Sequence, residues 1–315
     1  MPTAFLFPGQ GSQSVGMGQA LADAFPEAKT VFETVDEALG DALSSIVFDG
    51  PDDQLTLTAN TQPALMAVSL AAVEALKGSG ITVEGHADYV AGHSLGEYSA
   101  LAAGGAFDVA TAAKLLRTRG SAMQEAVPVG EGAMAAVLNL DLAAVEEIAD
   151  QASQGEVCEA ANDNAPGQVV VSGHKSAVER AIELAKEAGA RRAILLPVSA
   201  PFHCALMAPA ADVMGTALAD ATINQPVKPL VANVTASTVM DPSDIRTRLV
   251  EQVTGRVRWR ESIEWLAANG VDTYVEIGAG KALSGMVKRM VDGATILNVS
   301  APDDVARIAD HFARA

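Results

Sequence analysis

The sequence has few cysteines, few basic residues and no long apolar run. Its two cysteines, Cys158 and Cys204, are too few for a disulfide framework, and no Cys/His spacing resembles a zinc site. The 21 Lys and Arg residues stand against 39 Asp and Glu, giving a formal net charge of −18. A field of this sign repels phosphate, which argues against a protein that binds nucleic acid or an anionic membrane. No run of about 18 residues lacks polar interruption and the N-terminus does not resemble a signal peptide, so we expect a cytoplasmic protein without membrane spans.

The sequence does contain enough apolar material for a large core. Of its 315 residues, 49% are hydrophobic and 19% are charged, which is typical of a folded protein of about two domains. Short apolar segments alternate with amphipathic, helix-like segments in the first and last thirds of the chain. This alternation predicts a mainly parallel sheet covered by helices. The expected strands are residues 3–7, 89–91, 229–235, 273–277 and 295–299.

The middle of the chain has a different order of elements. Strand-like and helix-like segments follow one another as β-α-β-β-α-β, the ferredoxin-like pattern, with an Asn-Asp-Asn-Ala-Pro-Gly turn expected at residues 162–167. We therefore expect a small domain over residues 127–198, inserted into a discontinuous large α/β domain over residues 1–126 and 199–315.

The segment Gly92-His-Ser-Leu-Gly96 has the pattern G-x-S-x-G and lies between a predicted strand and a predicted helix. In a nucleophile elbow, the glycines permit a sharp turn that lifts the serine to the sheet edge, and the next backbone N–H can bind an oxyanion. A second interpretation is also open, because Ser94 and Glu97 have the spacing of a helix capping box, which needs no catalysis.

A catalytic serine needs a base, and the chain has five histidines. His203 follows the last strand of the inserted segment, where the chain returns to the large domain, and such a junction is a natural place for a cleft. A single histidine can equally be structural. A serine hydrolase of the α/β type has its histidine near the C-terminus. His311 alone suits that order, and its segment reads as an ordinary amphipathic surface helix.

Two further stretches allow a functional and a plain interpretation. The Gly-rich segment Phe7-Pro-Gly-Gln-Gly-Ser-Gln13 departs from the dinucleotide pattern at Ser14 and lacks the P-loop lysine. It is either a simple turn or a loop that brings backbone and the Gln10 amide to a reacting centre. Arg117 and Arg119 either lie at a solvated helix end or include a buried arginine that pairs with a carboxylate. Their positions do not distinguish the two.

Taken together, these motifs resemble the malonyl-CoA:acyl carrier protein transacylase family, the acyltransferases of fatty-acid synthesis. The resemblance extends over essentially the whole chain and implies an α/β-hydrolase-like core with a ferredoxin-like insertion. Six separated motifs carry it, in the order Phe7-Pro-Gly-Gln-Gly-Ser-Gln13, Gly92-His-Ser-Leu-Gly-Glu97, Arg117-Thr-Arg-Gly120, Asn162-Asp-Asn-Ala-Pro-Gly-Gln168, Pro201-Phe-His-Cys204 and Val275-Glu-Ile-Gly-Ala-Gly280.

The resemblance implies a role for individual positions of this chain. Ser94 corresponds to the acyl-accepting nucleophile and His203 to its base. Gln10 and the backbone N–H of Leu95 correspond to the oxyanion hole. The expected reaction is a ping-pong transfer through a Ser94 ester, without a metal or redox cofactor.

The remaining carried-over residues bind the substrate or orient the base. Arg119 corresponds to the arginine that holds the malonyl carboxylate, and Gln252 to the residue whose main-chain carbonyl orients the histidine. Asn162 corresponds to a residue that lines the cleft. Phe202, before the histidine, is similar to the malonyl-type pattern of related polyketide acyltransferases.

The implied substrates are malonyl-CoA and the phosphopantetheine thiol of holo-acyl carrier protein. The carrier is acidic in this family, so docking on this acidic chain requires a local basic patch. The candidates are Arg191, Arg192, Arg256, Arg258, Arg260, Lys288 and Arg289. We expect a monomer. The competing hypotheses are a serine thioesterase or esterase, and a non-catalytic acyl-binding module that retains the fold.

Overall fold

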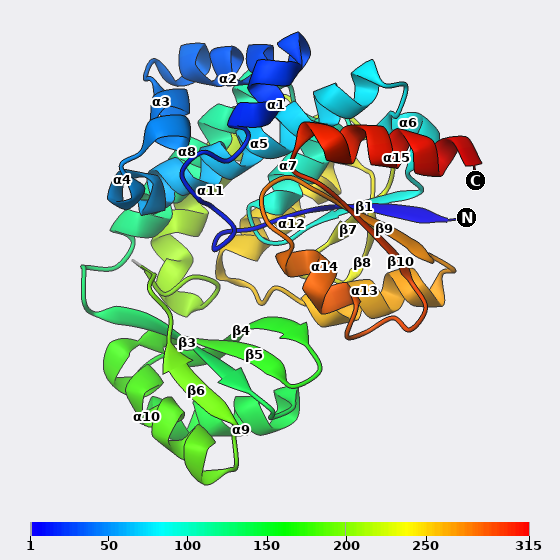
Figure 1. The fold of residues 1–315 in the computed structure, drawn as a ribbon. Helices are drawn as coiled ribbons and strands as arrows, with labels where there is room; N and C mark the ends of the chain where they lie inside the picture. The colour runs from blue at the N-terminus through cyan, green and yellow to red at the C-terminus, as the bar shows by residue number, and fades with distance from the viewer. Residues whose placement is uncertain (1, 199, 315) are drawn as a thin grey trace.

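The computed structural model describes residues 2–198 and 200–314 and contains two separate β-sheets (Figure 1). The strands of the larger sheet are β1 (Thr3–Phe7), β2 (Tyr89–Gly92), β7 (Leu230–Ala232), β8 (Ser237–Val239), β9 (Thr273–Ile277) and β10 (Thr295–Val299). Their order across the sheet is β10-β9-β1-β2-β7-β8. Neighbouring strands are parallel except for the antiparallel pair β7 and β8.

Helices cover both faces of this sheet. A large core on one face is shared by α1 (Gln19–Ala24), α2 (Pro26–Leu39), α3 (Leu43–Asp49), α4 (Asp52–Thr56), α5 (Thr58–Gly78), α6 (Val83–His86), α7 (Gly96–Ala103), α8 (Val109–Glu125), α11 (Ala208–Asp220), α12 (Pro242–Thr254) and α15 (Pro302–Arg314). A second core on the opposite face is shared by α13 (Trp259–Ala268) and α14 (Ala282–Val287).

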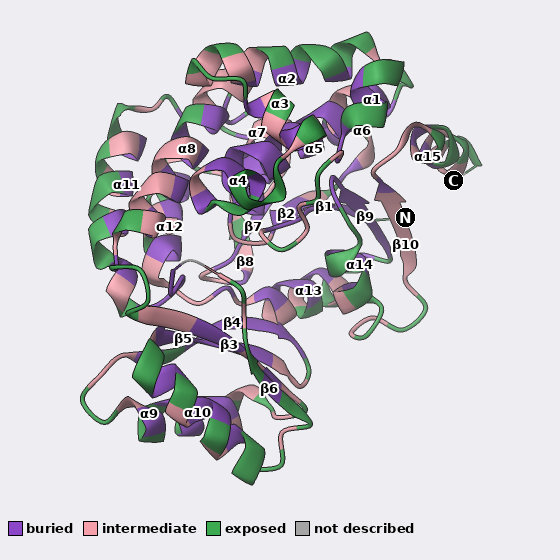
Figure 2. Cartoon of the chain, turned by 60° about the vertical axis from the view of Figure 1, so that its left-hand side comes forward, coloured by how far each residue is buried: buried purple, intermediate pink, exposed green. Residues whose placement is uncertain are grey.

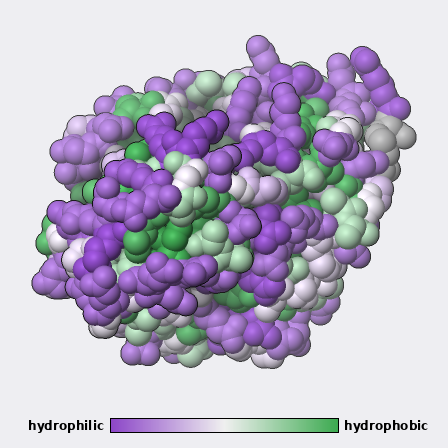
Figure 3. All heavy atoms as spheres, turned by 90° about the horizontal axis from the view of Figure 1, so that it is seen from below, coloured by the Kyte–Doolittle hydropathy of each residue, from purple (hydrophilic) through white to green (hydrophobic). Residues whose placement is uncertain are grey.

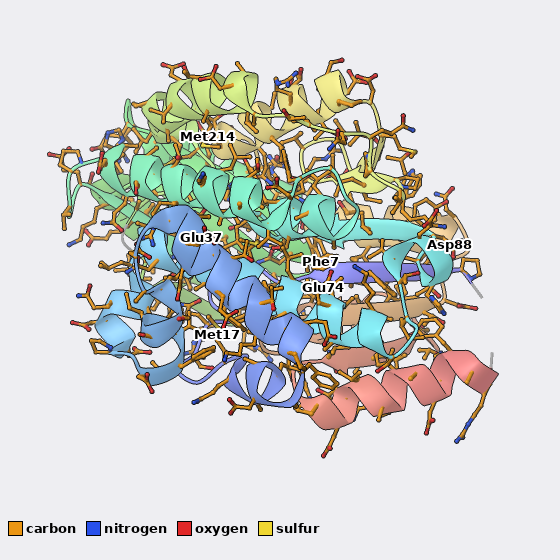
Figure 4. The ribbon with its side chains drawn as sticks, turned by 90° about the horizontal axis from the view of Figure 1, so that it is seen from above. Phe7, Met17, Glu37, Glu74, Asp88 and Met214 are labelled. Atoms are coloured by element: carbon orange, nitrogen blue, oxygen red, sulfur yellow. The ribbon has the colours of Figure 1, made fainter. Side chains whose placement is uncertain are left out.

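Strand β1 shows why the centre of the sheet is apolar throughout. Alternate side chains of a strand point to opposite faces, so Phe5 and Phe7 enter the first core while Ala4 and Leu6 enter the second. Because both faces are covered, the whole strand is buried (Figure 2). In the view from above, Phe7 lies in the middle of the molecule, among the helices of the first core (Figure 4).

The smaller sheet has the ferredoxin-like topology. Its strands are β3 (Gly132–Leu138), β4 (Cys158–Ala165), β5 (Gln168–His174) and β6 (Arg192–Leu195), and its helices are α9 (Leu142–Ser153) and α10 (Lys175–Glu187). The strands are antiparallel in the order β4-β5-β3-β6. They share an apolar core with α9 and α10. The α/β architecture and the β-α-β-β-α-β order predicted from the sequence are confirmed.

One local prediction for this sheet is wrong. The segment 162–164 does not form a turn but continues β4, and the reversal of the chain is confined to Pro166 and Gly167. The three polar side chains of this segment are buried against the larger sheet's helices and loops rather than solvated. Tertiary partners therefore outweigh a local composition that is typical of turns.

Strand β4 also contacts the larger domain at the connection between α12 and α13. The Asp163 N–H donates to the Val257 carbonyl at 2.9 Å, and the Val257 N–H donates to the Ala161 carbonyl at 2.9 Å. The Asp163 carboxylate, buried at 1% exposure, accepts from Arg260 Nη2 at 2.8 Å. These contacts hold the smaller sheet against residues 257–260, at the start of α13.

The molecular surface is mostly polar. Seen from below, hydrophilic side chains cover most of the visible face, with smaller hydrophobic areas between them (Figure 3). In the part of the chain that the structure describes, no helix combines the length and apolarity that crossing a membrane requires.

Candidate active site

Ser94 occupies a turn that only glycines on both sides permit. The turn links the end of β2 to the start of α7. A Cβ at Gly92 would lie 1.9 Å from the Gly96 carbonyl oxygen, and a Cβ at Gly96 would lie 2.2 Å from the Phe7 oxygen. Ser94 itself has a φ of 53°, in the left-handed region that few residues other than glycine adopt. The turn therefore has the sharp geometry of a nucleophile elbow.

The side chain of Asn233 supports this turn from the neighbouring strand end. It follows β7, and its Oδ1 accepts the Ser94 N–H at 2.8 Å. Its Nδ2 donates to the Gly92 carbonyl at 2.7 Å. One buried amide thus satisfies two backbone groups that the sharp turn leaves without partners.

His203 lies directly beside the serine. Its Nε2 is 2.7 Å from Ser94 Oγ, and its Nδ1 is 2.9 Å from the Gln252 carbonyl and 3.1 Å from the Gly255 carbonyl. Because carbonyl oxygens only accept, Nδ1 carries the proton and Nε2 is the acceptor for the serine hydroxyl. Burial, and then the charge of Arg119, lower the pKa of His203 to about 3. The imidazole is therefore neutral at physiological pH and can take a proton from Ser94.

The two arginines of α8 have different environments. Arg117 is near the surface, with Nη2 2.8 Å from Asp41 Oδ2. Arg119 is buried at 1% exposure. Its Nη1 donates to Gln62 Oε1 at 2.8 Å, and its Nη2 donates to Ser94 Oγ at 3.2 Å and to Gln252 Oε1 at 2.7 Å. A buried guanidinium next to a nucleophile is suited to bind a carboxylate on the acyl group.

The capping-box interpretation of Ser94 and Glu97 does not describe the observed contacts. The N-cap residue of α7 is Leu95, which makes no side-chain cap hydrogen bond. The Glu97 side chain accepts instead from the backbone of Asn233 at 3.0 Å and from the Gln252 amide. Ser94 Oγ is left to contact the histidine and the arginine.

The Gly-rich loop after β1 closes one side of the site. A Cβ at Gly9 would lie 2.6 Å from the His93 carbonyl oxygen, so the loop packs against the elbow. His93 turns away from the serine, and its Nε2 is 2.8 Å from Asn164 Oδ1 on β4. Gln10 follows Gly9, and its Nε2 is 3.4 Å from Thr58 Oγ1.

These groups surround one cavity of about 550 Å³. Ser94, His203 and Arg119 line it, as do the expected oxyanion residues Gln10 and Leu95. Leu95 stands at the start of α7, where the first backbone N–H groups have no partner within the helix. From the smaller sheet and the segment after it come Met134, Asn162, Leu196, Pro197 and Val198.

The structure adds two residues that the sequence did not reveal, Gln62 and Asn233. Each is buried and each contacts Arg119 or the Ser94 turn through a side-chain amide. Gln62 lies on α5, which is buried around most of its circumference. A polar residue within such an apolar helix is the signal that could have identified it. No comparable signal marks Asn233.

The basic docking candidates divide into paired and unpaired groups. Arg256, Arg258 and Arg260 bind carboxylates, of Glu146, of Glu261, and of Asp163 and Glu264 respectively. The others are exposed. Arg289 donates only to neutral groups, Gln168 Oε1 at 2.6 Å and the Pro166 carbonyl at 3.1 Å, on the β4–β5 connection. Among the described residues, no carboxylate lies within ion-pair distance of Arg191, Arg192, Lys288 or Arg289.

Within residues 2–198 and 200–314, no group of three His, Cys, Asp or Glu side chains is arranged to hold a metal ion.

A serine on a sharp strand-to-helix turn, a neutral histidine and a buried arginine define a serine enzyme that handles acyl groups. The chain belongs to the acyl transferase domain family, which matches residues 4–306. The malonyl CoA-acyl carrier protein transacylase of Bacillus subtilis (strain 168) is 48% identical over 303 residues, which are 96% of this chain and 94% of that protein. The resemblance that the sequence motifs indicated is thereby confirmed.

Solved structures give the same result. The acyl-carrier-protein-S-malonyltransferase from Bartonella henselae is 52% identical and superposes with a TM-score of 0.97 over 99% of this chain and 100% of that chain. A malonyl-transacylase solved in complex with a type II PKS acyl-carrier protein is 40% identical, with a TM-score of 0.96 over 99% of this chain and 100% of that chain.

Proposed function

We propose that this protein is an acyltransferase that moves a malonyl group from malonyl-CoA to the phosphopantetheine thiol of acyl carrier protein. The group travels as an ester on Ser94. The observation that carries the proposal is the position of Ser94 Oγ, 2.7 Å from His203 Nε2 and 3.2 Å from Arg119 Nη2. One hydroxyl thus lies within reach of a base and of a cation that suits the malonyl carboxylate.

In the first half-reaction, Ser94 Oγ attacks the thioester carbonyl carbon while its proton passes to His203 Nε2. The tetrahedral oxyanion is stabilised by the Leu95 N–H and the Gln10 amide. The carbon–sulfur bond then breaks, and His203 returns the proton to the departing CoA sulfur. Arg119 holds the malonyl carboxylate throughout and places the carbonyl over the serine.

The second half-reaction reverses these steps with a different thiol. The phosphopantetheine S–H gives its proton to His203, its sulfur attacks the Ser94 ester, and the Oγ–carbonyl bond breaks. His203 then reprotonates Ser94 Oγ. The histidine is oriented by the Gln252 and Gly255 carbonyls, at 2.9 and 3.1 Å, and not by a carboxylate. In our proposal this weaker base and the anchored malonyl carboxylate favour the thiol over water as acceptor.

We propose the same two domains that we expect from the sequence. Residues 1–126 and 199–315 form the catalytic domain, and residues 127–198 form the small domain, which contributes Asn162 to the cavity wall. The separate apolar core of the smaller sheet supports this division. For carrier docking we favour the exposed cations Arg191, Arg192, Lys288 and Arg289, because the other candidates already bind carboxylates.

A covalent-intermediate experiment tests the function. After brief incubation with malonyl-CoA, intact mass should show one malonyl adduct, and peptide mapping should place it on Ser94. The Ser94→Ala variant should show none, and holo-carrier should discharge the adduct of the wild type. Release of free malonate faster than transfer to holo-carrier would instead identify a thioesterase. Binding of malonyl-CoA without any adduct would identify a non-catalytic acyl-binding module.

A further inference from the structure

A buried carboxylate that the proposed reaction does not use lies behind the site. Glu97 is on α7, three residues after the nucleophile, and is only 1% exposed. Each of its oxygens faces a donor: Oε1 accepts the Asn233 N–H at 3.0 Å, and Oε2 accepts from Gln252 Nε2. Neither partner is a cation, and the positive charge of the nearby Arg119 favours the ionised form of the carboxylate.

The Gln252 side chain connects this carboxylate to the reacting groups. Its Nε2 also donates to the Ser94 carbonyl at 2.9 Å, while its Oε1 accepts from Arg119 Nη2 at 2.7 Å. Its main-chain carbonyl accepts the His203 Nδ1–H. One residue therefore contacts the nucleophile, the base and the carboxylate-binding arginine.

A side-chain amide can bind in two orientations, which exchange its donor and acceptor ends. Here two acceptors, Glu97 Oε2 and the Ser94 carbonyl, lie on one side, and the Arg119 donor lies on the other. A carboxylate only accepts hydrogen bonds. Together with the Ser94 carbonyl, which also only accepts, it admits the orientation in which Gln252 turns its oxygen towards Arg119 and excludes the reverse.

We propose that Glu97 is a positioning residue that fixes the orientation of the Gln252 amide, and thereby holds Arg119 over Ser94 and sets the preference for acyl groups that carry a carboxylate. This inference rests on the proposed function. Glu97 touches neither substrate nor reacting atoms in it, and acts only through Gln252 and Arg119.

Replacing Glu97 by glutamine shows why the charge state matters. If the oxygen of the introduced amide keeps the bond from the Asn233 N–H, the NH₂ group of that amide faces the Gln252 NH₂ group. Two donors cannot bind each other, and turning Gln252 over would set its oxygen against the Ser94 carbonyl, so the Gln252 side chain is displaced and its oxygen moves away from Arg119. The guanidinium loses an acceptor and leaves its position over Ser94. The volume of the side chain is unchanged, so packing is conserved.

The test compares malonyl and acetyl acylation of Ser94. Burial raises the pKa of Glu97 to about 7, against the lowering effects of the bonds from Asn233 and Gln252 and of the charge of Arg119. Measurements at pH 8 therefore keep this carboxylate ionised. The readout is the ratio of acylation rate constants with malonyl-CoA and acetyl-CoA, from intact mass under single-turnover conditions. This ratio does not depend on the fraction of active enzyme.

We expect Glu97→Gln to lower the malonyl rate by about 10- to 100-fold, the range for mispairing one charged hydrogen bond, with the acetyl rate within about threefold. The control is Glu276→Gln on β9. Glu276 is also 1% exposed and accepts two backbone N–H groups, of Leu283 and Ser284, outside the site. If the two substitutions only reduced stability, both variants would lose malonyl and acetyl acylation in proportion. Their malonyl-to-acetyl ratios would then stay at the wild-type value.

A double variant, Glu97→Gln with Gln252→Glu, restores the bonds that link positions 97, 252 and 119 with the charge moved. The Ser94 carbonyl loses its donor, which affects malonyl and acetyl acylation alike and leaves their ratio as the readout. The amide introduced at position 97 donates to the carboxylate introduced at position 252, whose second oxygen accepts from Arg119. We expect the malonyl-to-acetyl ratio to recover at least tenfold over the single variant, and this variant decides the matter if Glu97→Gln does not fold. An unchanged ratio in Glu97→Gln, or no recovery in the double variant, overturns the inference. Failure of the wild type to form a malonyl ester would overturn the proposed function instead.

Discussion

Replacing Arg119 by alanine tests substrate selection in the most direct way. The guanidinium is buried, and its bonds to Gln62, Ser94 and Gln252 occupy part of its five N–H donors. Within the described part of the chain, its Nε has no hydrogen-bond partner. Arg119 therefore has donors left for a carboxylate that enters the cavity.

The expected size of the effect follows from these bonds. Each hydrogen bond to a charged group contributes about 1.5–3 kcal/mol, and a carboxylate that takes two of them loses about 3–6 kcal/mol in Arg119→Ala. At about 1.4 kcal/mol for a factor of ten, kcat/KM for malonyl-CoA should fall by about 10²- to 10⁴-fold. Acetyl-CoA has no carboxylate to lose a bond, so its kcat/KM should stay within about tenfold.

The assay is transfer to holo-carrier at equal enzyme concentration, with malonyl-CoA and acetyl-CoA measured separately. Arg117→Ala is the matched control, because Arg117 is on the same helix but pairs with Asp41 near the surface. It should leave the malonyl-to-acetyl ratio unchanged. A ratio within about threefold of wild type in Arg119→Ala would refute the role given to this arginine.

Three further predictions concern the base, the elbow and the carrier. The pKa of His203 in the folded chain, about 3, is below its ordinary 6.5, so its contribution to the free energy of unfolding is complete above pH 6.5 and is lost as the pH falls towards 3. In urea unfolding, the free energy of unfolding of His203→Asn should therefore depend less on pH over that window than that of the wild type. Parallel curves for the two proteins would contradict this prediction. Asn233→Ala should lower the acylation rate of Ser94 by about tenfold or more and destabilise the fold by about 1–3 kcal/mol, because two backbone groups of the turn lose their partner. Single-turnover kinetics measures the rate and calorimetry measures the stability. An unchanged acylation rate would exclude a positioning role for Asn233. Arg289→Glu should slow malonyl transfer to holo-carrier by about tenfold without slowing transfer to free pantetheine. Equal slowing of both reactions would exclude a docking role for Arg289. The control is Arg314→Glu on the C-terminal helix, and a similar effect of this variant would also exclude the role.

The parts of the fold that follow from local sequence were predicted correctly. The spacing of Gly92 and Gly96 around the serine predicts the turn, because a Cβ at Gly92 would meet Gly96 only four residues on, although the clash at Gly96 is with the distant Phe7 carbonyl. The alternation of apolar and amphipathic segments similarly predicted the parallel sheet and the ferredoxin-like order. Helices α3, α4, α6 and α11 and strand β8 were not predicted, since each is short or weakly patterned.

The other parts depend on contacts between distant segments. Arg117 and Arg119 are two residues apart on one helix, so they point in different directions, and the close approach of α8 to α5 decides which is buried. That approach shows at Gly120, where a Cβ would lie 2.5 Å from the Thr58 carbonyl oxygen. Asn233 meets the Ser94 turn across 139 residues of chain. No local pattern encodes either contact.

The backbone at the two reacting residues has a consequence for engineering. Ser94 and His203 both have left-handed φ angles, 53° and 58°, which cost a non-glycine residue about 1–2 kcal/mol each. The rest of the fold sustains this conformation at some loss of overall stability. Ser94→Gly should therefore give an inactive protein that melts at a higher temperature than the wild type. Such a variant is suited to trapping unreacted malonyl-CoA or holo-carrier for structural work.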